Sequence, residues 1–194
     1  MASARLHVDA VRVLSALDHP EPEQQGLRGE YLAFLDRYAD AMWRELRVGH
    51  LTASALVMDA EGKRVLLTLH PKVGRWLQLG GHCEPGDASL QAACLREVVE
   101  ESGIQHVSLS DRPIRLDRHP VRCGPAMSEH LDVQYLAIVP SDAVPVMSEE
   151  SDDLQWFGVS DLPSGLDDSV LQLIRDAIAY QKSSVHRLGT PFPS

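Results

Sequence analysis

The fold of this chain is decided by residues 80–104, which read GGHCEPGDASLQAACLREVVEESGI. Two adjacent glycines and a Pro-Gly pair predict a sharp loop with accessible backbone groups. Asp87 and Ser89 are residue types that cap a helix, and Gly103 stands where a helix would end. The stretch therefore predicts a loop that leads into a helix from about residue 88 to residue 102.

Three carboxylates share one stripe of this predicted helix. At about 100° per residue, Glu97, Glu100 and Glu101 fall within an arc of about 100°. Like charges at these spacings repel, and the helix dipole disfavours them in the C-terminal half. A hard divalent cation offsets both effects, and a loop carbonyl can add an oxygen ligand. The alternative is a solvated acidic face in which Arg96 pairs with Glu100.

The glycine loop, the cap and the acidic stripe together resemble the signature of the Nudix hydrolase family. That signature reads Gly, five residues, Glu, seven residues, Arg-Glu, an aliphatic, any residue, Glu-Glu, any residue, Gly, an aliphatic. Gly81 opens it here, and residues 96–104 close it position for position. Asp87 stands in place of the first Glu, and eight residues rather than seven separate it from Arg96. The resemblance implies an α/β/α sandwich that hydrolyses a diphosphate linked to another group, usually a nucleoside diphosphate derivative.

The resemblance also implies roles for particular residues. Glu97, Glu100 and Glu101 match the catalytic, metal-binding carboxylates, and the carbonyl of Gly81 matches the backbone ligand. The expected ion is Mg²⁺, with Mn²⁺ as a substitute. Glu150 resembles a late loop glutamate that supplies a further catalytic and metal-binding carboxylate, and a solvated acidic loop is the alternative. The sequence does not settle which residue activates water, and the candidates are Glu100, Glu149 and Glu150.

Four residues near the predicted site are candidates for substrate contacts. Lys72 and Arg75 precede the glycines and suit phosphate oxygens. His82 adjoins the metal loop, and Tyr135 can stack on a base. Each also has a structural alternative, as a solvated cation, a residue that orients the loop or a core residue. His130 and Asp132 begin a buried strand, where they either line the pocket or mark its solvent end.

The rest of the chain predicts a mixed α/β sheet between helices. An N-terminal helical extension, residues 1–48, has helical apolar spacing over 5–18 and 24–46, and it packs on the main domain or forms a dimer surface. A Nudix hydrolase domain follows over residues 49–182, and residues 183–194 read as a loose tail. Within the domain, strands are expected at 50–58, 64–69, 107–109, 114–121, 131–139 and 154–159, with a last helix from Asp167 or Asp168 to Gln181.

Charge and composition narrow the partners. A net charge of −10 argues against a nucleic-acid duplex. The cysteines lack the spacing of a zinc cluster and favour a reducing compartment. No apolar run reaches the roughly 18 residues of a membrane span, and the N-terminus lacks the apolar core of a signal peptide. We therefore expect a cytoplasmic protein that acts on a small-molecule diphosphate without a membrane partner, and a homodimer is one option.

Two other functions fit the same fold. A non-catalytic Nudix-like module could sense a nucleotide or a nucleotide sugar, although a sensor has no need to keep all three carboxylates. An isomerase of prenyl diphosphates needs a catalytic Cys and Glu pair. Cys83 lies close to the predicted site, but no clear pair is present.

Overall fold

Eight strands form one mixed sheet at the centre of the computed structural model, which describes residues 2–123, 126–149 and 151–188. The path through the sheet is β3-β2-β1-β7-β5, while β4 pairs with β1, β6 with β7 and β8 with β2. The strands are β1 (His50–Asp59), β2 (Arg64–His70), β3 (Arg75–Leu77), β4 (Leu79–His82), β5 (Ser108–Leu109), β6 (Arg115–Cys123), β7 (Ala126–Val139) and β8 (Asp153–Gly158).

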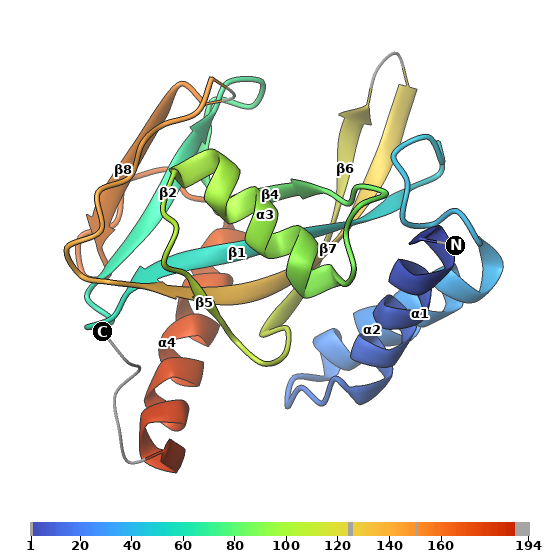
Figure 1. Cartoon of the computed structure of the whole chain (residues 1–194), viewed down its shortest axis with the longest axis horizontal. Coiled ribbons are helices and arrows are strands. Elements are labelled where there is room, and N and C mark those ends of the chain that lie inside the picture. The colour runs from blue at the N-terminus through green and yellow to red at the C-terminus, as the bar shows by residue number, and fades with distance from the viewer. Residues whose placement is uncertain (1, 124–125, 150, 189–194) are drawn as a thin grey trace.

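Helices cover both faces of this sheet (Figure 1). They are α1 (Ala2–Ala16), α2 (Pro22–Arg37), α3 (Leu90–Ser102) and α4 (Asp168–Leu188). Ala53 and Val57 of β1 share a buried cluster with α3, whereas Leu56 and Met58 share another with α4. Alternate residues of a strand face opposite sides, so α3 and α4 lie on opposite faces. The predicted α/β/α sandwich is confirmed.

The two central strands, β1 and β7, run parallel and in register from His50 opposite His130 to Asp59 opposite Val139. All ten residues of β1 are buried, as expected for a strand covered on both faces. On its other edge, β1 pairs first with β4 and then with β2. The glycines of β4 therefore lie directly beside the central strand.

The N-terminal helices pack into the same hydrophobic core as α3. Leu6, Leu14, Tyr31 and Leu35 are buried there. The side-chain amide of Gln24 donates to the carbonyl of Leu116 at 3.0 Å and accepts from its N–H at 2.7 Å. Since Leu116 lies in β6, this pair holds α2 against that strand. None of the described helices is long and apolar enough to cross a membrane.

All four helices differ in their boundaries from the sequence prediction: α1 spans residues 2–16 rather than 5–18, and α2 begins at residue 22 rather than 24. The helix predicted over residues 24–46 ends at Arg37, since Tyr38 is extended with φ −125° and ψ 107°. Short turns then bury Ala41 and Met42 and lead the chain into β1. The central helix begins at residue 90 rather than 88, and the last helix continues to residue 188 rather than 181.

Candidate functional site

Two glycines of β4 let backbone approach its neighbours closely. A Cβ on Gly80, whose φ is +151°, would lie 2.3 Å from the Cβ and 2.4 Å from the Cα of Ser54. A Cβ on Gly81 would lie 2.8 Å from a carboxylate oxygen of Glu97. Gly80 therefore lets β4 lie against β1, and Gly81 leaves space for a carboxylate of α3 beside bare backbone.

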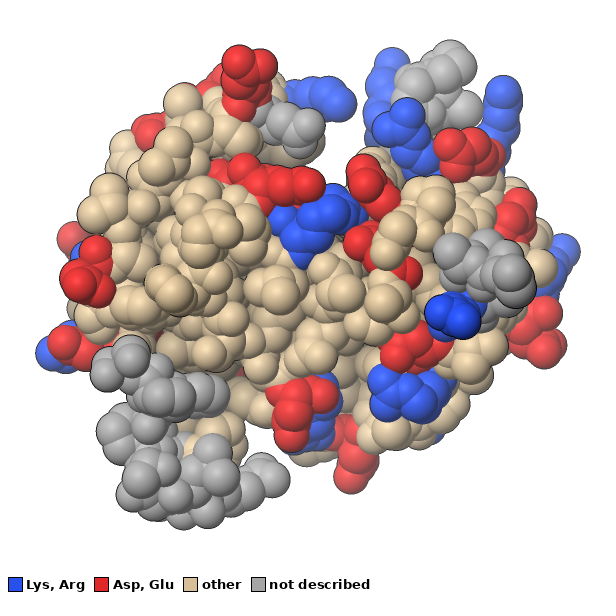
Figure 2. Space-filling model, in the orientation of Figure 1, with Lys and Arg blue, Asp and Glu red and all other residues tan. Residues whose placement is uncertain are grey.

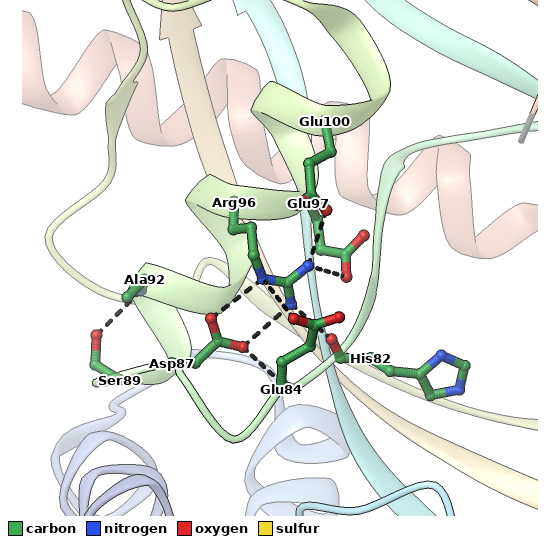
Figure 3. Close-up of polar contacts among 8 residues, drawn as sticks. All are labelled: His82, Glu84, Asp87, Ser89, Ala92, Arg96, Glu97 and Glu100. Atoms are coloured by element: carbon green, nitrogen blue, oxygen red, sulfur yellow. Dashed lines mark hydrogen bonds and ion pairs between the residues drawn. The ribbon is translucent and has the colours of Figure 1, made fainter. Parts of the chain in front are cut away.

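Arg96 is the centre of the polar contacts at this site (Figure 3). Its guanidinium donates to Glu97 at 2.9 Å, to Glu100 at 3.0 Å and to the carbonyl of His82 at 2.9 Å. It also donates to both carboxylate oxygens of Asp87, at 3.2 and 3.1 Å. Burial acts to lower the pKa of Arg96, but the hydrogen bonds to Asp87 and Glu97 raise it above its usual value. The arginine thus ties the glycine loop to α3.

Asp87, which stands in place of the first glutamate of the signature, binds Arg96 and also closes the loop. Besides binding Arg96, its carboxylate accepts from the backbone N–H of Glu84 at 2.7 Å and closes the loop. Helix α3 is capped by Ser89, whose hydroxyl accepts from the N–H of Ala92 at 3.0 Å. At the other end, Gly103 has the left-handed φ of 68° that ends the helix as predicted.

The predicted carboxylates lie along α3, next to the glycine loop. Arg96 draws Glu97 and Glu100 to one guanidinium, so the solvated-face alternative describes part of what is seen. Glu97 has 12% of its side chain exposed and Glu100 has 59%. Acidic side chains flank a basic patch at a notch on this face of the molecule (Figure 2). Among the described residues, the carboxylate oxygens of Glu97, Glu100 and Glu101 do not all come within 4.8 Å of one another.

The structure separates the other predicted site residues. Glu150 lies outside the described residues. Arg75 forms an ion pair with Asp167, just before α4 on the face opposite α3. Lys72 is exposed in the loop between β2 and β3. Tyr135 is 1% exposed within the core, and burial raises its pKa above the usual range.

A buried polar patch lies across β1 and β7, on the face of the sheet opposite α3. Asp132, 3% exposed, accepts from the hydroxyls of Thr52 at 2.9 Å and Ser54 at 2.6 Å. It also accepts from the amides of Gln78 at 3.3 Å and Gln134 at 3.1 Å. Sequence reasoning noted Asp132 but missed its partners. The signal was present, since polar residues occupy every second position at 50–54 and 130–134, and such residues share one face of a strand.

Three histidines extend this patch at the start of the central strands. The ring centroids of His50, His82 and His130 lie 4.9 to 5.1 Å apart. Burial, aided by the neighbouring imidazoles, lowers the pKa of His50 to about 4 and that of His130 to about 3. The ring centroid of His119 lies 5.5 Å from that of His130, and Nδ1 of His119 is 2.6 Å from a carboxylate oxygen of Asp117. That hydrogen bond raises the pKa of His119.

Comparisons with known proteins agree on the fold. A model of the NUDIX domain matches residues 49–177, which is more than half of the chain. The chain is 30% identical over 115 residues to the NAD-capped RNA hydrolase NudC of Pseudomonas syringae pv. syringae (strain B728a). That match covers 58% of this chain and 38% of the relative, so this chain spans well under two thirds of the relative's length.

Solved structures give the same result. A NUDIX-family hydrolase from Clostridium perfringens superposes with a TM-score of 0.56 and 26% identity, over 68% of this chain and 97% of that chain. The NUDIX domain of Shewanella oneidensis NrtR, solved with ADP ribose, gives 0.52 and 24% identity, over 78% of this chain and 97% of that domain. At 24% identity, the similarity to the Shewanella domain shows a shared fold and nothing more.

Proposed function

The chain belongs to the Nudix family, and we propose that within it this protein is a Mg²⁺-dependent pyrophosphohydrolase. Its substrate is a nucleoside diphosphate linked to another group, and water attacks one of the two phosphorus atoms. The printed name of the Pseudomonas relative, a hydrolase of NAD-capped RNA, is consistent with this substrate class, because NAD contains such a diphosphate.

One observation carries the proposal, namely the carboxylate of Glu97 against the bare backbone of Gly81. A Cβ on Gly81 would fill the space beside that carboxylate, at 2.8 Å. The surrounding donors on α3 are carboxylate oxygens, which suit a hard divalent cation. The residues present therefore fit Mg²⁺ or Mn²⁺ held by Gly81, Glu97, Glu100 and Glu101.

Residues of the chain have separate tasks in this account. Once bound, the metal neutralises phosphate charge and lowers the pKa of a coordinated water. Arg96 positions Glu97 and Glu100 on α3 and fixes the loop through the carbonyl of His82. The α3 carboxylates would hold the cation, and Glu100, Glu149 or Glu150 would accept the proton from water.

A prenyl diphosphate isomerase is less consistent with the site. Burial, followed by the nearby Asp87, raises the pKa of Cys83 to about 12. A thiol of this kind stays protonated at neutral pH and is not a ready nucleophile or base.

A substrate panel tests the proposed reaction. Dinucleotides, ADP-ribose, nucleotide sugars, nucleoside triphosphates and diphosphoinositol phosphates are each incubated with protein and Mg²⁺, and the phosphorylated products are measured. Cleavage of a phosphoanhydride that stops in excess EDTA supports the hydrolase. Binding of one of these compounds by calorimetry with no product formed would favour the sensor instead.

Gly81→Ala is expected to weaken Mn²⁺ binding at the α3 carboxylates by at least about tenfold while leaving the fold intact. The added methyl group meets the flexible end of Glu97, which moves away at small cost in stability and takes a ligand from the cation. Mn²⁺ binding measured by electron paramagnetic resonance checks this, with thermal unfolding as the test of the fold. Gly86→Ala, in the loop that follows β4, is the control, since no atom of the described residues lies within 4 Å of a Cβ there. Equal affinity in the two variants would contradict the role of Gly81.

A further inference from the structure

A group of three histidines is brought together by strand register alone. His50 of β1 lies opposite His130 of β7, and Thr52 of β1 lies opposite His82 of β4. Each histidine offers one ligand nitrogen, and these three atoms lie within 4.8 Å of one another. Within the described residues, no other group of three histidine, cysteine, aspartate or glutamate side chains meets this condition.

The histidines lie on the other face of the sheet from the α3 carboxylates. His50 has the same parity along β1 as Leu56 and Met58, which pack with α4. By contrast, Gly81 faces Glu97 of α3. Figure 3 shows the ring of His82 directed away from Arg96, although its carbonyl accepts from that arginine. The two sets of ligands are therefore separate sites on the two sides of β4.

His50 itself indicates a ligand. The side chain is 0% exposed, and neither ring nitrogen makes a hydrogen bond of normal geometry with the described residues. The backbone of Leu46 lies near enough to act on the pKa of His50, but it does not form a hydrogen bond of normal geometry with either ring nitrogen. A buried polar group without a partner destabilises the fold, and buried polar groups of this kind call for an explanation. A metal ion between the three rings supplies the missing partner.

We propose that His50, His82 and His130 bind a divalent transition metal of the Zn²⁺, Co²⁺ or Ni²⁺ class, with a fourth coordination position open. Imidazole nitrogen suits these ions, whereas Mg²⁺ prefers oxygen ligands. The transition metal therefore binds at the histidines and Mg²⁺ at the α3 carboxylates. Three protein ligands with an open position are the arrangement of zinc sites that take a water or a substrate atom.

The geometry needs only a small adjustment. Tetrahedral zinc with bonds of 2.0–2.1 Å places its nitrogens about 3.4 Å apart, compared with the 4.8 Å limit here. Rotations that move each ring by about 1 Å close that difference. His82 and His130 are only partly buried, which leaves an approach from solvent. His119, held by Asp117, lies beside His130 and can keep that ring in place.

Cobalt binding to the full chain tests the site. The protein is stripped of metal, placed in excess Mg²⁺ to fill the carboxylates, and titrated with Co²⁺ while the visible spectrum is recorded. We expect one equivalent with the intense bands of a tetrahedral ion, displaced by Zn²⁺. His130→Gln and His82→Gln are expected to weaken this binding by at least about 100-fold, the upper end of what loss of an outer-shell partner costs.

Two controls locate the ion. His106→Gln removes an exposed histidine outside the group and should bind Co²⁺ as the unaltered chain does. Glu101→Gln should also keep the tetrahedral spectrum, and because this readout does not depend on hydrolysis, the site can fail or hold independently of the proposed function. A zinc-edge anomalous map of the unaltered protein gives a second measurement, with a peak about 2.0–2.1 Å from the three ring nitrogens.

The outcomes separate clearly. Absence of a stoichiometric tetrahedral spectrum in the unaltered chain overturns the proposal, as does a spectrum that survives in folded His130→Gln and His82→Gln proteins. Loss of the spectrum in Glu101→Gln would place the ion among the α3 carboxylates and likewise overturn it. If the histidine variants do not fold, judged by circular dichroism, the anomalous map decides, and no peak between the rings rejects the site.

Discussion

Glu101→Gln is expected to lower kcat for diphosphate hydrolysis by about 100- to 1000-fold without unfolding the protein. The substitution keeps the shape of the side chain and removes its charge, so the cation is held less well where negative charge develops on the phosphates. A loss of that size corresponds to about 3–4 kcal/mol of transition-state stabilisation. Initial rates with Mg²⁺ on the best substrate of the panel, together with thermal unfolding, measure both parts of the expectation.

The matched control for this variant is Glu45→Gln. Its side chain is 79% exposed, outside α3 and the glycine loop, so its neutralisation should leave kcat within about twofold. Full turnover by a folded Glu101→Gln protein would show that the carboxylate of Glu101 is not needed for the reaction. Full turnover of the unaltered chain in excess EDTA would show that the reaction does not need a metal ion.

Gly80→Ala is expected to cost at least about 3 kcal/mol of folding free energy or to prevent folding. The new methyl group would lie 2.3 Å from a Cβ and 2.4 Å from a backbone Cα of Ser54, and neither atom can rotate away. Overpacking costs about 1–3 kcal/mol, and the φ of +151° adds strain of about 1–3 kcal/mol for a residue with a side chain. Denaturant unfolding followed by circular dichroism gives the change in free energy.

Gly29→Ala is the comparison variant, and it is expected to raise the free energy of unfolding rather than lower it. This glycine lies within α2, and no atom in the described part of the chain lies within 4 Å of a Cβ there, so alanine should stabilise the protein by about 0.5–1 kcal/mol. If Gly80→Ala unfolds within 1 kcal/mol of the unaltered chain, β4 does not depend on close backbone contact with β1 as we describe.

The local parts of the fold were predictable because each rests on neighbours in the chain. Helix α3 ends at Gly103 as its sequence predicts, and the strands expected at 50–58 and 131–139 form as parts of β1 and β7. The prediction for α2 was wrong because tertiary packing overrode helical periodicity. Ala41 and Met42 are buried in the turns that lead into β1, so their burial does not require a longer helix.

Contacts between distant segments could not be predicted in the same way. The sequence offered an Arg96–Glu100 pair within α3, and that pair forms, but the contact with Asp87 depends on how the loop folds back. Arg75 pairs with Asp167, which is 92 residues away. The histidine group is likewise visible only once β1, β4 and β7 are placed in register.

The most direct test of the central claim is a manganese anomalous map from crystals of this protein soaked in MnCl₂. We expect an ion about 2 Å from carboxylate oxygens of α3 and from the carbonyl oxygen of Gly81, with Glu97 turned from Arg96 toward the ion. A map with no manganese at this position, and with Glu97 and Glu100 still on the guanidinium of Arg96, would contradict it.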